Sequence, residues 1–207
     1  PEESADPTLA GVTYEVRPDA RAERVAVQAC FDGVPPARLV APEPAAELLT
    51  EVRGPRGEAL PHAETITLPG VGPGECVRWT VDLRRAAFTR EVTLRGGEAL
   101  LAPGLLLWRP PQRGLPLRVR FELPAGIYAS GPWVQAGVAK ELSTDDLRVP
   151  GNLAFTRSPP LRIRQAETEL EAAVFAGELA VDRAGIGRWL RAAVRAVDTF
   201  GDGFPVA

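Results

Sequence analysis

Catalytic chemistry needs nucleophiles, acid–base groups or metal ligands at suitable spacings, and this 207-residue sequence contains few of them. His62, in LPHAET, is the only histidine. It has no nucleophile or orienting partner nearby in the sequence, so a surface position is favoured over a hydrolase acting through His62. A zinc site needs about three ligands at regular spacing, and the sequence has no HExxH, no CxxC and no second histidine. We predict no catalytic, cofactor-binding or metal-binding residue in this chain.

Two other motifs favour turns over chemistry. Asp145 and Asp146 are adjacent in LSTDDLRVPGN. Neighbours on a strand point to opposite faces, and the spaced oxygen ligands of a calcium loop are missing. Residues 69–74 (PGVGPG) lack the Lys-Ser/Thr that follows a phosphate loop. We expect a solvated turn or a helix N-terminus at the aspartates and a plain turn at the glycines.

The two cysteines are candidates for a disulfide. Cys30 (VAVQACFDG) and Cys76 (GECVRWTV) lie in separate strand-like segments. In an exported protein they could form one bridge across strands, and the alternative is two buried thiols. The sequence opens on a polar stretch with no initiator Met, which suits a mature exported chain. We therefore expect a periplasmic or secreted protein. The sequence does not decide between a disulfide and two buried thiols.

Tryptophans are the remaining candidates for binding. Trp79, Trp108 and Trp133 lie on or beside strand-like segments, and Trp189 lies in a helical one. Exposed together, such side chains bind peptide or carbohydrate, whereas buried they form a sandwich core. We favour the core and keep Trp108, Trp133 and Trp189 as possible interaction residues.

Bulk composition excludes several classes of protein. Apolar residues make up 45% and charged residues 25% of the chain, an ordinary globular mixture. No apolar run approaches the ~20 residues that span a bilayer, so no membrane span is expected. The net charge is -3 and no basic cluster stands out, so we expect no nucleic-acid partner.

Residues 12–175 have the pattern of short strands separated by turns. The 20 glycines and 21 prolines between apolar runs favour antiparallel sheets. Alternation in 76–83 places Val77, Trp79, Val81 and Leu83 on one core-facing side. The predicted strands are 12–16, 24–31, 47–53, 64–68, 76–83, 117–123, 161–164 and 171–175.

A helical pattern follows at residues 187–200 (GRWLRAAVRAVDTF). Its period of 3.6 predicts an amphipathic helix, and Gly201 would be its C-cap. Any part of the apolar stripe that stays exposed would indicate a missing partner. The predicted stripe consists of Trp189, Leu190, Ala193, Val194, Val197 and Phe200.

Three features, taken in order, resemble a known family: the β-rich region, residues 105–133 (LLLWRPPQRGLPLRVRFELPAGIYASGPW) and residues 188–207 (RWLRAAVRAVDTFGDGFPVA). They are similar to the N-terminal half of the glycyl-aminopeptidase-like zinc metallopeptidases, a bacterial, PDZ-containing, thermolysin-type group. LPAGI (123–127) is similar to an LPxGW-like turn of that family, with Ile127 where an aromatic is usual. FGDGFP (200–205) is similar to its FGxYP phrase, with one extra residue.

The resemblance implies a mainly β fold, an antiparallel β-sandwich like the aminopeptidase N-terminal domain, followed by a short α/β segment with one amphipathic helix. Expected divisions are a mobile N-terminus (1–10), the sandwich (11–165) and the start of a truncated catalytic-like domain (166–207). The family's HExxH helix lies downstream, so zinc is expected only in the missing catalytic domain.

The implied role is a noncatalytic domain that shapes the substrate cleft and helps to hold the substrate N-terminus. Its partners would be the remaining catalytic domain of the same protein and the peptide substrate. The alternative is a stand-alone extracytoplasmic β-sandwich that binds peptide, glycan or another protein.

Overall fold

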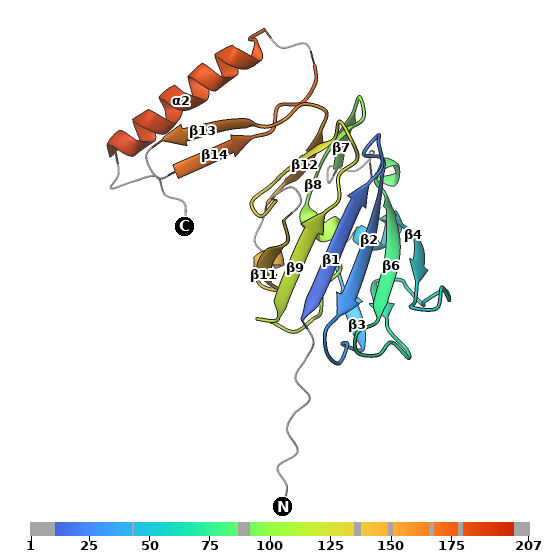
Figure 1. The fold of residues 1–207 in the computed structure, drawn as a ribbon. Helices are drawn as coiled ribbons and strands as arrows, with labels where there is room; N and C mark the ends of the chain where they lie inside the picture. Colours follow the sequence, from blue (N-terminus) through green and yellow to red (C-terminus); the bar gives the residue numbers. More distant parts are fainter. Residues whose placement is uncertain are drawn as a thin grey trace, which may run out of the picture.

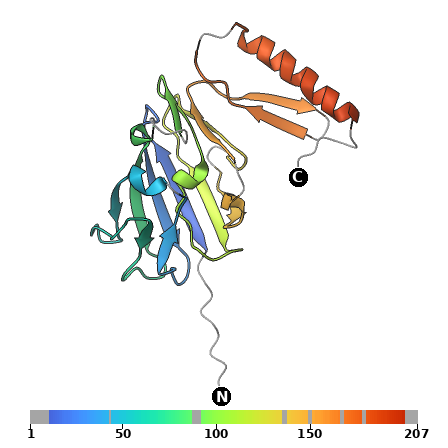
Figure 2. The same cartoon turned by 180° about the vertical axis from the view of Figure 1, so that it is seen from behind.

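The computed structural model describes residues 11–42, 44–86, 92–134, 138–148, 151–165, 168–177 and 180–200. Two β-sheets form the body, and a hairpin with a long helix extends to one side of it (Figures 1 and 2). The expected mobile N-terminus and the Gly201 cap lie outside the described residues.

The larger sheet has six strands in the order β11-β9-β1-β2-β6-β4. Its neighbouring strands are antiparallel apart from β1 and β9, which run parallel with Val12 opposite Leu117. The mainly antiparallel arrangement expected from the sequence is therefore confirmed, with this parallel pair as the exception. The strands are β1 (Val12–Pro18), β2 (Arg24–Phe31), β4 (Leu49–Arg53), β6 (Cys76–Asp82), β9 (Pro116–Phe121) and β11 (Lys140–Ser143).

A four-stranded antiparallel sheet in the order β10-β12-β8-β7 forms the second layer. A two-stranded ladder, β3 with β5, and several short helical turns complete the body. These elements are β3 (Arg38–Val40), α1 (Ala45–Leu48), β5 (Thr65–Thr67), η1 (Leu83–Arg85), β7 (Val92–Arg95), β8 (Glu98–Leu101), η2 (Pro103–Leu105), β10 (Tyr128–Ser130), η3 (Asp146–Arg148) and β12 (Leu153–Thr156).

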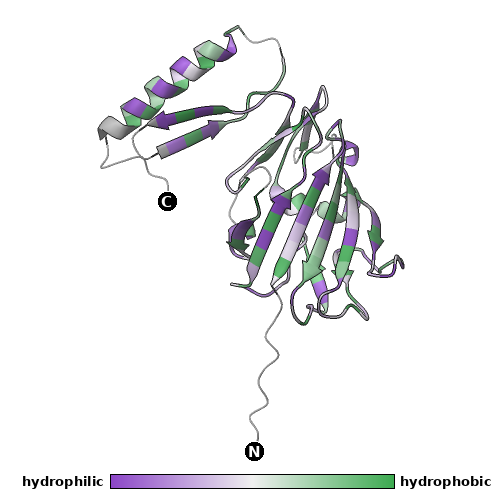
Figure 3. Cartoon of the chain, viewed as in Figure 1, coloured by the Kyte–Doolittle hydropathy of each residue, from purple (hydrophilic) through white to green (hydrophobic). Residues whose placement is uncertain are grey.

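The core lies between the sheets because one side of each long strand is apolar. Buried and exposed positions alternate along β1 and β9. Figure 3 shows the matching alternation of hydrophobic and hydrophilic residues along these strands. The predicted core face of 76–83 is confirmed, since Val77, Trp79, Val81 and Leu83 are all buried. Phe121 on β9 and Phe155 on β12 meet edge to face across the layers, with ring centroids 6.4 Å apart.

Two buried polar groups of the core find backbone partners, whereas Trp108 Nε1 is buried without one among the described residues. The Tyr14 hydroxyl donates to the Trp108 carbonyl at 2.6 Å, and Trp79 Nε1 donates to the Leu106 carbonyl at 2.9 Å. These two bonds fix the segment that crosses the core after η2. Burial raises the pKa of Tyr14 far above its usual range, so the hydroxyl stays protonated and remains a donor.

Beyond β12, the chain forms a hairpin of β13 (Leu161–Gln165) and β14 (Thr168–Ala172), and α2 (Arg183–Phe200) packs on β13. Asp182 precedes the helix, and its carboxylate accepts the Gly185 N–H at 2.7 Å. This cap starts the helix four residues before the predicted 187. The predicted division at residue 165 falls within this hairpin and stays a prediction.

Most predicted strands match observed ones, and the boundaries differ for identifiable reasons. The predicted bounds of the strand 171–175 were wrong. β14 ends at Ala172, which pairs with Leu161, so the strand stops before Val174 and Phe175. The predicted strand 47–53 begins late, since its first two residues belong to α1. The predicted strand 117–123 ends at Phe121.

Candidate functional site

The tryptophans occupy very different environments. Trp79 and Trp108 are fully buried in the sandwich core, so the indole of Trp108 is not a surface group. Trp133 is half-buried beside the core. Trp189 on α2 is 68% exposed. Of the possible interaction residues, only Trp189 presents a large apolar surface to solvent.

Trp133 lies where the sandwich meets the hairpin. It lines a polar hollow of about 430 Å³ together with Lys140 on β11 and the charged side chains of β13 and β14. Those charges are paired across the hairpin, with Arg162 donating to Glu171 at 3.2 Å and Arg164 to Glu169 at 3.1 Å. Among the described residues of the hairpin, the charges that line the hollow are therefore all paired.

Helix α2 uses only part of its predicted stripe to pack on β13. Val194 is 4% exposed, and Leu190 is half-buried. Trp189 and Val197 are exposed, so the described residues leave this part of the predicted stripe uncovered. Together with Ala193 they follow one another at four-residue spacing on one side of the helix. We call this set the 189/193/197 row.

The side of α2 opposite the apolar stripe is positively charged. Arg188, Arg191 and Arg195 are exposed on α2, while the 189/193/197 row contains no charge. An exposed apolar row beside a charged face is typical of a surface that another protein element covers.

A buried carboxylate ties this region to the sandwich. Glu98 on β8 is 1% exposed, and its two oxygens accept the backbone N–H groups of Arg157 at 2.8 Å and Ala176 at 2.5 Å. Those residues precede β13 and follow β14. Arg183, in the first turn of α2, also donates to the carbonyl of Pro159. The hairpin and helix are therefore anchored at their base.

The sequence contained no signal for the role of Glu98. It lies in RGGEALLAPG, where an acidic residue before an apolar run suggests an exposed strand start. Only the tertiary structure brings two backbone donors to it from 59 and 78 residues away in the chain.

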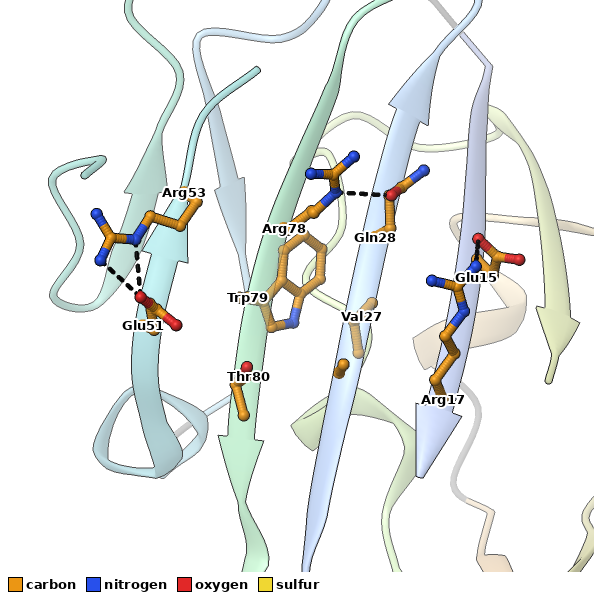
Figure 4. A pocket seen from close by; sticks show the side chains of 10 residues that line it. Glu15, Arg17, Val27, Gln28, Glu51, Arg53, Arg78, Trp79 and Thr80 are labelled. Carbon is orange, nitrogen blue, oxygen red and sulfur yellow. Dashed lines mark hydrogen bonds and ion pairs between the residues drawn. The ribbon is translucent and has the colours of Figure 1, made fainter. Parts of the chain in front are cut away.

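Cys30 and Cys76 form a disulfide between directly paired residues of β2 and β6. Beside it, the outer face of the larger sheet has a shallow depression of about 210 Å³ (Figure 4). The polar groups there are paired with one another: Arg53 donates to Glu51 at 2.6 Å, Arg17 lies 2.7 Å from Glu15, and Arg78 donates to the uncharged Gln28 at 2.8 Å. This face has the character of a solvated sheet surface.

The remaining polar candidates behave as the sequence predicted. His62 is exposed, with Nδ1 3.1 Å from the Leu60 carbonyl oxygen. Asp146 begins η3 and accepts hydrogen bonds from the Ser143 N–H and hydroxyl, which lower the pKa of its carboxyl.

The described residues bring no three His, Cys, Asp or Glu side chains together as metal ligands, so they do not fit a zinc site. In the same part of the chain, no helix is long and apolar enough to cross a membrane. The candidate functional surface is the 189/193/197 row of α2, together with the ends of the β13–β14 hairpin that Glu98 holds to β8.

No family model and no curated protein matches the sequence. The fold is similar to solved structures. An aminopeptidase N family protein from Idiomarina loihiensis superposes with a TM-score of 0.70 and 11% sequence identity, and the match covers 94% of this chain and 37% of that chain. Legionella pneumophila aminopeptidase A has a TM-score of 0.43 and 13% identity, with 79% of this chain and 23% of that chain covered. Native yeast LTA4 hydrolase has a TM-score of 0.41 and 8% identity, with 79% of this chain and 31% of that chain covered. The chain thus spans little more than a third of the first protein, and the likeness shows a shared fold.

Proposed function

We propose that this chain is the noncatalytic N-terminal part of a zinc aminopeptidase of the thermolysin type. The observation that carries the proposal is the likeness of 94% of the chain to 37% of an aminopeptidase N family protein. The absence of a ligand set among the described residues fits a noncatalytic part. Zinc and the acid–base groups would then belong to the rest of the protein, which includes the PDZ domain of the resembled family.

The 189/193/197 row supports a specific place for that partner. An indole that is 68% exposed and a neighbouring exposed valine, Val197, leave apolar surface in water, and covering it would stabilise a contact by about 25 cal/mol per Å². We propose that the catalytic domain covers this row. The sandwich would then shape one wall of the substrate cleft and help to hold the peptide N-terminus.

The disulfide supports an exported location. Disulfides persist in oxidising compartments such as the periplasm and are rare in the cytosol of most organisms. Cys30 and Cys76 bridge two central strands, and no free cysteine lies among the described residues. We propose a periplasmic or secreted bacterial protein.

Hydrogen exchange tests where the partner packs. Backbone exchange of α2 would be compared between residues 1–207 alone and the product of the intact gene. We expect exchange around Trp189 and Val197 to slow at least tenfold in the intact protein, because a covered helix opens less often. Strand β2, already central in the sheet, serves as the internal reference and should not change.

A matched pair of variants makes the comparison specific to the row. Trp189→Ser should restore fast exchange in the intact protein, whereas Ala192→Ser, on the exposed side of the same helix, should not. Equal exchange of α2 in both proteins would refute the proposed contact. It would favour the alternative, a stand-alone binding module.

A further inference from the structure

A second hollow, of about 570 Å³, lies between η2 and η3 at the edge of the sandwich. Its walls are largely apolar and include Pro103, Leu107 and Leu147. Two guanidinium groups, Arg109 and Arg148, also line it, and none of its described lining residues is acidic. The hollow is distinct from the α2 surface and from the depression on the outer sheet face.

Arg109 is held in place by its backbone alone. Its N–H donates to the Val40 carbonyl at 2.9 Å, and its carbonyl accepts the Val40 N–H at 2.8 Å. Its guanidinium, in contrast, makes no hydrogen bond or ion pair with any described residue, and its Nε is buried without a partner. A buried donor without an acceptor is costly, so such groups are rare and call for an explanation.

Several other arginines of the sandwich pair with carboxylates, and no other arginine of the described residues has a buried Nε without a partner. Arg84 makes a two-pronged contact with Asp82, and Arg53 makes one with Glu51. Arg148, the second guanidinium of the hollow, lies 3.6 Å from Asp145 and donates to the Pro111 carbonyl. Arg109 alone in this comparison faces a hollow with its donors unused.

The electrostatics of the hollow favour an anion. Burial, and then the positive charge of Arg148, lower the pKa of Arg109 below its usual range. An arginine side chain nevertheless stays protonated in proteins, so its charge is retained. An anion between the two guanidinium groups would relieve their repulsion and supply the missing acceptor.

We propose that this hollow binds a carboxylate attached to an apolar group. A planar carboxylate matches the fork of a guanidinium, and Leu107, Leu147 and Pro103 provide an apolar wall for the attached group. The ligand is either a free small carboxylate or the C-terminal carboxylate of a peptide. This site rests on the contacts of Arg109 and does not depend on the proposed aminopeptidase role.

Titration with N-acetyl-L-leucine, followed by calorimetry or by backbone amide shifts, tests the proposal. We expect it to bind at least tenfold tighter than N-acetyl-L-leucinamide, which lacks the charge, and tighter than acetate, which lacks the apolar group. A capped tripeptide ending in leucine distinguishes the two sources: binding as tight as that of N-acetyl-L-leucine assigns a peptide terminus, and weaker binding assigns a small carboxylate. Equal affinity for acid and amide, or tighter binding of inorganic phosphate, would overturn the assignment.

Variants locate the binding group. Arg109→Gln should lower the affinity for N-acetyl-L-leucine about tenfold or more, the loss of a charge-assisted contact. Arg113→Gln removes an exposed arginine outside the hollow and should leave the affinity unchanged. Because the Arg109 guanidinium has no partner among the residues that the structure describes, Arg109→Gln should also keep the urea midpoint of the parent protein. Unchanged affinity in folded Arg109→Gln would overturn the proposal.

Discussion

The carboxylate of Glu98 accepts a hydrogen bond of 2.5 Å from the backbone N–H of Ala176, 78 residues further along the chain. Its other oxygen accepts the N–H of Arg157 at 2.8 Å, so one side chain ties both ends of the β13–β14 hairpin to β8. The position of α2, and of the surface that it exposes, depends on this anchor.

Replacing Glu98 tests the anchor. Glu98→Ala leaves two backbone N–H groups without an acceptor, and we expect it to lower the free energy of unfolding by about 2–4 kcal/mol. Glu98→Gln keeps one good acceptor and should cost less. Urea denaturation measures both, with Glu64→Gln, an exposed carboxylate, as the control. A Glu98→Ala protein as stable as the control would contradict the role of the anchor.

Reducing the disulfide should destabilise the sandwich without changing its fold. The bridge between Cys30 and Cys76 closes a loop over a separation of 46 residues, and we expect its loss to lower the free energy of unfolding by about 2–4 kcal/mol. Urea curves with and without a reductant measure the effect. The double variant Cys30→Ser, Cys76→Ser should match the reduced protein and show no response to the reductant. A response in that variant would mean that the reductant acts elsewhere.

The ion pair of Asp82 with Arg84 should make part of the free energy of unfolding sensitive to acid. The two-pronged hydrogen bond from Arg84 lowers the pKa of the Asp82 carboxyl from 3.8 to about 2. Since the folded value lies below the unfolded one, the contribution is fully present above about pH 4 and is lost as the pH falls toward 2. We expect it to be about 1–2 kcal/mol, because the partner arginine is half exposed. Asp82→Asn should flatten the fall in urea midpoint between pH 5 and 2, and an unchanged slope would be the contrary result.

Two substitutions on α2 distinguish its buried side from its exposed row. Val194→Ala should cost about 1–3 kcal/mol, because this side chain is buried against the hairpin. Trp189→Ser should cost less than about 1 kcal/mol in residues 1–207, since its indole is 68% exposed. Urea denaturation of both variants would give the opposite order if the helix packed through Trp189.

How far the sequence predicted this structure depends on the length of each pattern. Long alternating runs such as 24–31 and 76–83 were identified as strands, and 76–83 with its buried face, because period-two alternation follows from a half-buried strand. Most strands of three or four residues, such as β3, β7 and β10, were missed because so short a run has no period, and β5 was found only within the longer predicted strand 64–68. The turn between β7 and β8 had a signal, Gly96-Gly97, both with positive φ, as a two-residue hairpin turn requires.

The candidate surfaces were predicted less well, because they depend on contacts distant in sequence. The amphipathic pattern of α2 was visible, but which half of the stripe β13 covers is decided by the hairpin. The guanidinium of Arg109 had no signal in WRPPQRG, since only the fold shows that it forms no ion pair with a carboxylate of the described residues.

The most direct test of the proposed role is zinc content and aminopeptidase activity, measured in parallel on residues 1–207 and on the product of the intact gene. We expect the intact protein to hold about one zinc ion per chain, to release N-terminal residues from peptides and to lose both properties on chelation. Residues 1–207 should show neither. Tightly bound, stoichiometric zinc with activity in residues 1–207, or an intact gene product with neither, would contradict the account.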